Sequence, residues 1–210
     1  MLKADKLPDS WITVHRAMRG NFTRCLEVAL DATEDDPIAQ RVGPSRRCRR
    51  RYVGYVLARG FKNGRVTLAQ PRGGVCVASR VGRSWSPLVL WNRVRLLASL
   101  SSSQRDRLQS IESAVEDNAE AGTWWVHCLA IRPRFRGRGL GPRLLRQALS
   151  AQSETPVLVQ TARETLAKEM EDRGAEHLDS VRLKGGSSPL FLYRLNPADL
   201  RRSVEATSQA

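Results

Sequence analysis

The pattern of apolar and polar positions is clearest in the second half of the chain. Residues 124–131 are almost continuously apolar, as in a buried strand, whereas residues 140–149 repeat their apolar positions at helical spacing. Gly174 suits the left-handed position that ends a helix. The pattern predicts strand 124–131, helix 140–149, strand 156–160, helix 164–173 and strands 176–183 and 190–195.

The first half carries weaker signals of the same kinds. Asn21 and Ser103 are candidate helix caps, and the acidic segment Glu34–Pro37 is interpreted as a loop. The pattern predicts strand 11–17, a helix from Asn21, a helix over about 46–61, strands 65–70 and 74–80, and two helices within 87–118. This order predicts an α/β (α+β) domain around one mixed sheet.

Length and composition fit one domain. The 210 residues are 41% hydrophobic, enough for a sizeable core, so we expect residues 1–198 to form a single domain and 199–210 a flexible tail. No apolar run approaches the roughly 20 residues of a membrane span, and no secretory signal opens the chain. We therefore expect a cytoplasmic protein without a membrane partner.

The chain is strongly basic, with a net charge of +14. Such a field attracts nucleic acid, an anionic surface or a phosphorylated cofactor, although an arginine-rich composition also follows from a GC-rich genome. The run Arg46–Arg51 supports a nucleic-acid or ribosome-associated role, but no aromatic residues interleave it. The four cysteines lie far apart, so we expect reduced thiols and no metal site.

The segment with the clearest chemistry runs from Leu129 to Gly141. A buried strand leads into a loop of glycine and arginine, and the loop opens a helix. Free amides at a helix N-terminus favour anions, and glycines allow close approach to a pyrophosphate. The spacing excludes a Rossmann fingerprint and a P-loop. A tight turn with solvated arginines remains the alternative interpretation.

These residues resemble motif A of the GNAT superfamily of N-acetyltransferases. Its signature, [QR]-x-x-G-x-[GA], is met by Arg136, Gly139 and Gly141, and the resemblance extends over residues 123–196. The layout is most similar to the branch that includes puromycin N-acetyltransferase. The resemblance implies a mixed, mostly antiparallel sheet flanked by helices and splayed at the acetyl-CoA site.

The resemblance also implies a mechanism. Acetyl-CoA, or another acyl-CoA, is the co-substrate, and an amine of a small molecule or peptide attacks the thioester directly. The backbone of the strand would hold the pantetheine, and the loop amides would hold the pyrophosphate. The implied coenzyme-binding residues are Leu129, Ala130, Ile131, Arg136, Gly137, Arg138, Gly139, Leu140 and Gly141.

The chain departs from the family at the position of the acid that protonates the leaving thiolate. The usual tyrosine position holds Met170, the usual asparagine position holds Leu166, and methionine cannot donate a proton. Three accounts remain open. The thiolate leaves unassisted or takes a proton from water, Tyr193 or Cys128 replaces the acid, or the domain is a silent acyl-CoA binder.

The candidate general base is His127, because an imidazole titrates near neutral pH. Strict alternation would place it on the same face of its strand as Trp125 and Leu129. A packed histidine is the alternative. The carboxylates of Glu34, Asp35 and Asp36 are further candidates, and the tryptophans are candidates for lining an acceptor pocket.

Overall fold

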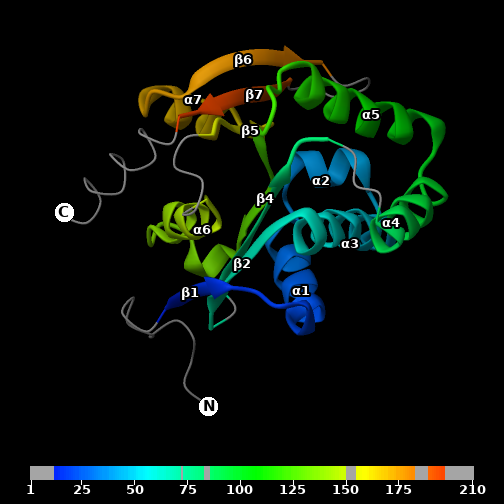
Figure 1. Ribbon diagram of the computed structural model, residues 1–210, viewed down its shortest axis with the longest axis horizontal. Coiled ribbons are helices and arrows are strands. Elements are labelled where there is room, and N and C mark those ends of the chain that lie inside the picture. Colours follow the sequence, from blue (N-terminus) through cyan, green and yellow to red (C-terminus); the bar gives the residue numbers. More distant parts are fainter. Residues whose placement is uncertain (1–11, 72, 83–85, 150–154, 183–188, 197–210) are drawn as a thin grey trace.

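The computed structural model describes residues 12–71, 73–82, 86–149, 155–182 and 189–196. Figure 1 shows the chain as a sheet with helices on both faces. The expected tail, residues 199–210, and the turn at 184–188 lie outside the described residues.

The described strands form one seven-stranded sheet in the order β1-β2-β3-β4-β5-β7-β6. Neighbouring strands are antiparallel except β4 and β5, which are parallel. The strands are β1 (Thr13–Arg16), β2 (Gly64–Gln70), β3 (Gly74–Arg80), β4 (Trp124–Ile131), β5 (Val157–Thr161), β6 (Glu176–Val181) and β7 (Leu190–Leu195). The predicted mixed, mostly antiparallel sheet is confirmed.

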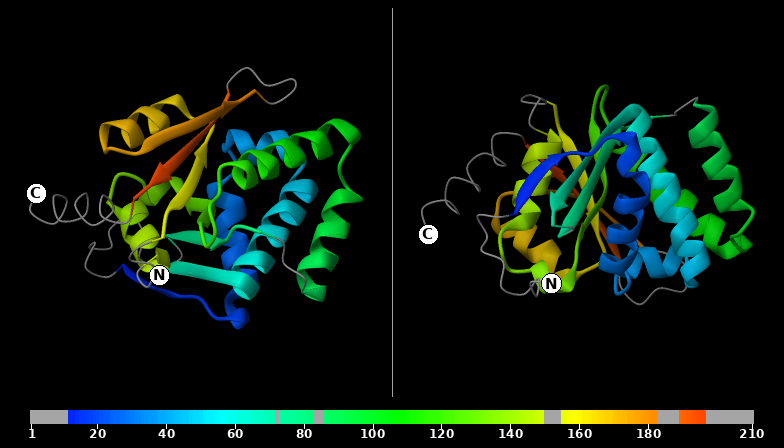
Figure 2. Two further views of the ribbon diagram at one scale, coloured as in Figure 1. Left: turned by 45° about the horizontal axis from the view of Figure 1, so that its top comes forward. Right: turned by 90° about the horizontal axis from the view of Figure 1, so that it is seen from below.

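Helices cover both faces of the sheet (Figure 2). The α-helices are α1 (Phe22–Ala32), α2 (Pro37–Val42), α3 (Arg46–Asn63), α4 (Pro87–Leu97), α5 (Ser102–Asp117), α6 (Leu140–Leu149) and α7 (Glu164–Asp172). Two 3-10 turns, η3 (Arg19–Asn21) and η4 (Pro133–Phe135), precede α1 and α6. None of these described helices combines the length and apolarity needed to cross a membrane.

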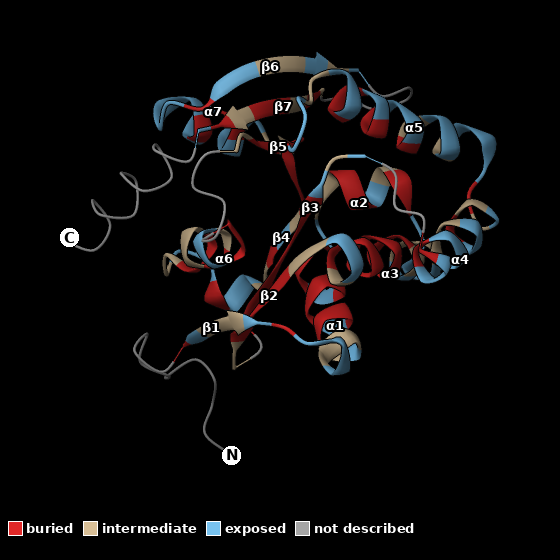
Figure 3. Cartoon of the chain, viewed as in Figure 1, coloured by how far each residue is buried: buried red, intermediate tan, exposed pale blue. Residues whose placement is uncertain are grey.

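Two apolar cores lie on opposite faces of the sheet, as the buried positions in Figure 3 indicate. Strand β3 supplies both in alternation, since Val75 and Val77 enter the core under α1 to α5, whereas Cys76 and Ala78 enter the core under α6 and α7. A strand that is buried on both faces needs apolar residues at nearly every position. This explains the nearly continuous apolar sequences of β3 and β4.

Two local predictions were wrong. The segment after Asp36 is helix α2, because Pro37 occupies its first turn and the Asp36 carboxylate accepts a hydrogen bond from Ala39 N at 2.8 Å. Helix α5 is capped by Ser101 and not by Ser103. Ser101 and Gln104 form a reciprocal capping box, in which each side chain accepts from the other residue's backbone N–H.

Candidate functional site

Strands β4 and β5 separate part-way along the sheet. They pair only where Trp124–Val126 lies beside Val157–Val159. Strand β4 nevertheless stays paired with β3 as far as Ile131, opposite Gly74. The remaining half of β4 therefore presents one edge to an opening between the two parallel strands, which is the splay that the sequence resemblance implied.

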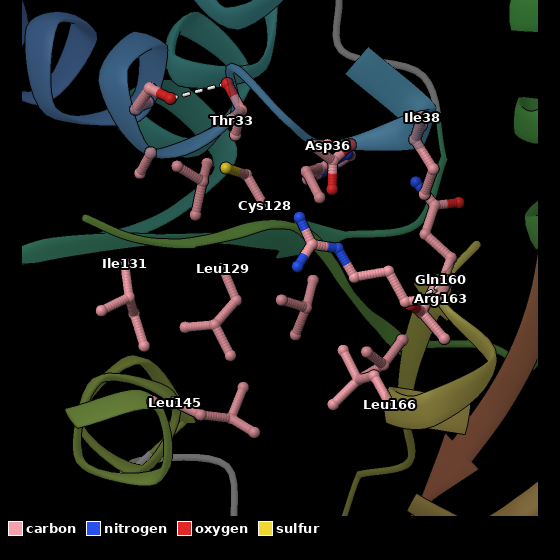
Figure 4. Close-up of a pocket in the computed structure, with 18 of the residues that line it drawn as sticks. Thr33, Asp36, Ile38, Cys128, Leu129, Ile131, Leu145, Gln160, Arg163 and Leu166 are labelled. Atoms are coloured by element: carbon pink, nitrogen blue, oxygen red, sulfur yellow. Dashed lines mark hydrogen bonds between the residues drawn. The ribbon is translucent and has the colours of Figure 1, made fainter. Parts of the chain in front are cut away.

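A cavity of about 740 Å³ passes through this opening and extends along both faces of β4 (Figure 4). We call the part beneath α6 and α7 the α6 side, and the part beneath α1, α2 and α3 the α3 side. The α6 side is lined by residues that include Leu129, Ile131, Arg136, Gly137, Gly139, Leu140, Gly141, Leu145, Leu166 and Met170. The α3 side is lined by residues that include Ala29, Ala32, Thr33, Asp36, Tyr52, Val53, Val56, Leu57, His127 and Cys128.

The loop on the α6 side needs its glycines. Gly137 and Gly139 have φ of +75° and +64°, a left-handed conformation that side chains rarely adopt. A Cβ at Gly141 would lie 3.3 Å from Ile131 Cδ1, so the first turn of α6 passes close to β4. The start of α6 therefore lines the cavity, and Gly139 and Gly141 carry no side chain that could cover their backbone amides, which suits an anion site.

Most of the residues predicted to bind the coenzyme line the cavity. Ala130 and Arg138 are outside its wall, and the Ala130 side chain packs into the core beneath α3. The Arg136 guanidinium does not lie free for a phosphate. It donates hydrogen bonds to the carbonyl oxygens of Ile131 at 3.2 Å and Ala32 at 3.3 Å, and so joins β4 to the end of α1.

His127 lies on the α3 side together with Trp125, as alternation predicts, and a bulge in β4 turns Leu129 to the other face. The β3–β4 pairing shifts register beside His127, which is the extra residue. Its ring stacks on Trp125 with centroids 3.9 Å apart, whereas Leu129 points to the α6 side (Figure 4). The expectation that His127 and Leu129 share a face is therefore wrong, since strict alternation does not survive a bulge.

The His127 imidazole is held as a neutral group. It is 8% exposed, and its Nε2 lies 2.7 Å from Ser79 Oγ. Burial, and then the positive charge of Arg59, hold the pKa of His127 well below its ordinary value. A base with a lowered pKa accepts a proton less readily, so this environment weakens the case for His127 as the general base.

Among the three candidate carboxylates, the structure places Asp36 in the cavity wall. Glu34 and Asp35 are exposed and lie outside the wall, whereas Asp36 is partly buried. Burial raises the pKa of Asp36, opposed by the hydrogen bond from Ala39 N and by the charge of Arg163. A carboxylate with a raised pKa is a stronger base than a solvated one, and its charge attracts ammonium groups.

The candidate acids are placed differently. Met170 lines the α6 side of the cavity. Tyr193 lies outside the wall, where its hydroxyl donates to Glu171 Oε1 at 2.7 Å. Cys128 lines the α3 side, and burial, together with the nearby charge of Asp36, raises its pKa to about 12. The Cys128 thiol therefore keeps its proton and is a weak acid.

The tryptophans among the described residues do not line the cavity. Trp124 and Trp125 are each 5% exposed in separate cores, Trp91 is 61% exposed on α4, and Trp85 is outside the described residues. Tyr52 of α3 provides an aromatic surface on the α3 side instead. The sequence predicted the spacing of apolar residues on α3, but it did not predict the cavity that these residues face.

The basic run occupies the first turns of α3. Arg46, Arg47 and Arg50 are exposed, while Arg49 donates to Pro44 O at 2.9 Å and Arg51 to Arg95 O at 3.3 Å. Two arginines of the run therefore hold α3 against neighbouring segments. The exposed arginines of the run remain available for the alternative role of binding a polyanion.

Known proteins resemble this chain in part of its sequence and in most of its structure. A model of the acetyltransferase (GNAT) family matches residues 84–156, whereas no curated protein matches the chain. An acetyltransferase from Corynebacterium glutamicum, described as histone acetyltransferase HPA2 and related, superposes with a TM-score of 0.67 at 15% identity, covering 89% of this chain and 96% of the other. The chain has the GNAT fold.

Two insect enzymes share this fold. The Drosophila melanogaster polyamine N-acetyltransferase that forms N-acetylagmatine has a TM-score of 0.61 at 18% identity, over 88% of this chain and 99% of its own. Arylalkylamine N-acetyltransferase 2 from Aedes aegypti has a TM-score of 0.63 at 10% identity, over 89% and 99%. The expected fold is confirmed, while the puromycin N-acetyltransferase branch stays a prediction.

Proposed function

We propose that the protein is an acyl-CoA-dependent N-acyltransferase that moves an acetyl group from acetyl-CoA to an amine. The observation that carries the proposal is a single cavity through the β4–β5 opening. On one side it meets a glycine-lined helix N-terminus, and on the other an apolar pocket with the Asp36 carboxylate. The match of residues 84–156 to the acetyltransferase (GNAT) family supports it.

The α6 side would hold the coenzyme. The loop amides from Arg136 to Gly141 would bind the pyrophosphate, and the backbone of Leu129, Ala130 and Ile131 would align the pantetheine. The left-handed glycines and the open edge of β4 fit such a ligand, because both offer main-chain donors without side-chain cover. The coenzyme supplies the acetyl thioester.

The α3 side would hold the acceptor. Asp36 would bind the ammonium group and take one of its protons, which leaves a neutral amine. The amine nitrogen then attacks the thioester carbon, the C–N bond forms, the C–S bond breaks, and the second N–H proton offsets the charge of the thiolate. We prefer Asp36 to His127 as the base, because the pKa of Asp36 is raised and that of His127 is lowered.

The structural neighbours named as polyamine and arylalkylamine acetyltransferases support an amine as the acceptor. The acceptor amine belongs either to a small molecule or to a peptide. The free cysteines fit the cytoplasmic location that we propose with this activity.

Calorimetric titration with acetyl-CoA, followed by an amine panel read by free-thiol release, tests this proposal. We expect saturable heat and acceptor-dependent thiol release. The absence of any thermal or calorimetric response at millimolar acetyl-CoA would remove the proposal.

A second candidate function is acyl-CoA binding without turnover. Met170 favours it, because this residue lines the cavity at the position of the family's usual acid. Heat with acetyl-CoA but no thiol release with any amine would select this function. Retention of RNA on filters that falls steeply with salt would instead support the nucleic-acid role of the Arg46–Arg51 run.

A further inference from the structure

Two side chains of opposite charge line the cavity at the opening between β4 and β5. Asp36 enters the cavity from the start of α2, and Arg163 enters it from the start of α7. In the view of Figure 4 the Arg163 guanidinium extends toward Asp36. The charge of Arg163 also opposes the rise in the pKa of Asp36, so the two groups act on each other.

The position of Arg163 is fixed at both ends. Its backbone N–H donates to Thr161 Oγ1 at 3.1 Å, where β5 ends, and its Nη2 donates to Asp35 O at 3.1 Å, beside Asp36. A guanidinium carries five N–H donors in a planar fork. The side chain thus extends from the end of β5 to the α1–α2 turn, and its charge lies beside the acceptor pocket.

This arrangement does not suit a simple alkylamine. Asp36 attracts an ammonium group, but a guanidinium beside it repels the same group, and both effects are strong where water is scarce. An acceptor that places a carboxylate next to its ammonium group would satisfy both side chains. Arginine is well suited to this task because its fork binds a carboxylate through two parallel hydrogen bonds.

We propose that the acceptor is an α-amino acid with an apolar side chain. Its ammonium group would lie at Asp36, its carboxylate at Arg163, and its side chain against Val53, Val56 and Leu57 of α3. We choose the α position because Asp36 and Arg163 line the same cavity and influence each other's charge, and an ammonium and a carboxylate on one carbon form the most compact acceptor that can reach both. This inference rests on the proposed N-acyltransferase function.

The transfer is balanced for such an acceptor. Asp36 receives the first N–H proton, the amine nitrogen bonds to the acetyl carbon, the thioester C–S bond breaks, and the second N–H proton neutralises the departing thiolate. The carboxylate of the acceptor is unchanged and stays paired with Arg163 throughout. The products are an N-acetyl amino acid and free coenzyme A.

Matched acceptor pairs test the inference. Leucine, methionine, phenylalanine and tryptophan are each compared with the corresponding carboxamide, which keeps the amine and side chain but has no carboxylate charge. We expect the wild type to favour the free acids in kcat/KM. In Arg163→Gln the free acids should lose roughly 10- to 100-fold, and the amides less than about threefold, because one charged hydrogen-bonding partner is removed.

Two further variants serve as controls. Arg95→Gln removes an exposed arginine of α4 outside the cavity wall and should leave the acid-to-amide ratio unchanged. Arg163→Lys keeps the charge without the fork and should fall between the wild type and Arg163→Gln. Unchanged acetyl-CoA affinity would show that each variant has kept its fold.

The alternative outcomes are distinct. An equal loss for acids and amides in Arg163→Gln would place the guanidinium in a step common to all acceptors and would overturn the inference. Preference of the wild type for the amides would also overturn it, while the proposed function would stand. The absence of acetyl-CoA binding, or of thiol release with every amine tested, would remove both.

Discussion

The two sides of the cavity are built in different ways. The α6 side comes mainly from one continuous stretch, where β4, the glycine loop and α6 follow each other within residues 124–149, and its recognition groups belong to the main chain. The α3 side brings together α1, α2, α3 and the bulge of β4, and its recognition groups are side chains. The α6 side therefore suits a ligand that every member of a fold family shares, and the α3 side suits a ligand that varies.

This contrast predicts that variants on the two sides separate turnover from coenzyme binding. The largest expected effect is that of Asp36→Asn. Loss of the carboxylate should lower kcat/KM for any amine by roughly 10²–10⁴-fold, the range typical of a positioned base. Affinity for acetyl-CoA, measured by calorimetry, should stay within about twofold. Asparagine is also a good helix cap, so α2 should be preserved.

Asp35→Asn is the matched control for this variant. Asp35 is exposed and outside the cavity wall, and its contact with Arg163 uses its backbone carbonyl, which the substitution keeps. It should retain nearly full activity. Equal losses in the two variants would mean that the net charge of the turn matters and that Asp36 has no special role.

Gly139→Ala is the complementary test on the α6 side. The left-handed φ of +64° costs alanine about 1–2 kcal/mol, so the loop should relax away from the shape that presents its amides. We expect the Kd for acetyl-CoA to rise roughly 5- to 30-fold, the equivalent of that strain. The acceptor KM, measured at saturating coenzyme, should change little.

Gly122→Ala introduces similar strain elsewhere. Gly122 has φ +85°, lies outside the cavity wall, and has only Thr155 Cγ2, at 3.8 Å, near its added Cβ among the described residues. Gly122→Ala should lose about as much thermal stability as Gly139→Ala, but it should bind acetyl-CoA with the affinity of the wild type. A weakened affinity in both variants would show that general destabilisation explains the effect.

The same contrast explains what the sequence could predict. Strand β4, the loop and α6 are local, so their apolar pattern and glycine spacing predicted both the elements and the residues at the cavity. The position of Asp36 depends on the six-residue helix α2, and the acidic, proline-containing segment before it predicts a loop and not a helix. The separation of Leu129 from the face of His127 depends on a bulge, and a bulge arises from pairing with β3, which no local pattern encodes.

Met170→Tyr tests whether the α6 side of the cavity lacks an acid. Met170 lines the cavity on α7, so a tyrosine hydroxyl there would face the region of the leaving thiolate. We expect kcat to rise about fivefold, less than a well-positioned acid provides, because no neighbour has evolved to orient the hydroxyl. Met170→Phe supplies the ring without the hydroxyl and should give no gain. A gain in both variants would indicate packing as the cause.

The smallest expected effect concerns His127, which faces the α3 side but is packed against Ser79 and Trp125. Its folded pKa lies below the unfolded value near 6.5, so the unfolded chain binds a proton that the folded protein does not, and stability falls as pH drops below about 6.5. The free energy of unfolding of His127→Gln should therefore fall less between pH 7.5 and 5.5, by up to about 1.4 kcal/mol, as denaturant titrations at both pH values would measure. Its kcat/KM should stay within about threefold, because glutamine can keep a hydrogen bond to Ser79 and Asp36 supplies the base. If His127→Gln instead lost most of its activity, and its pH–rate profile no longer fell at acidic pH, His127 would be the base. Asp36 would then serve only to hold the ammonium group.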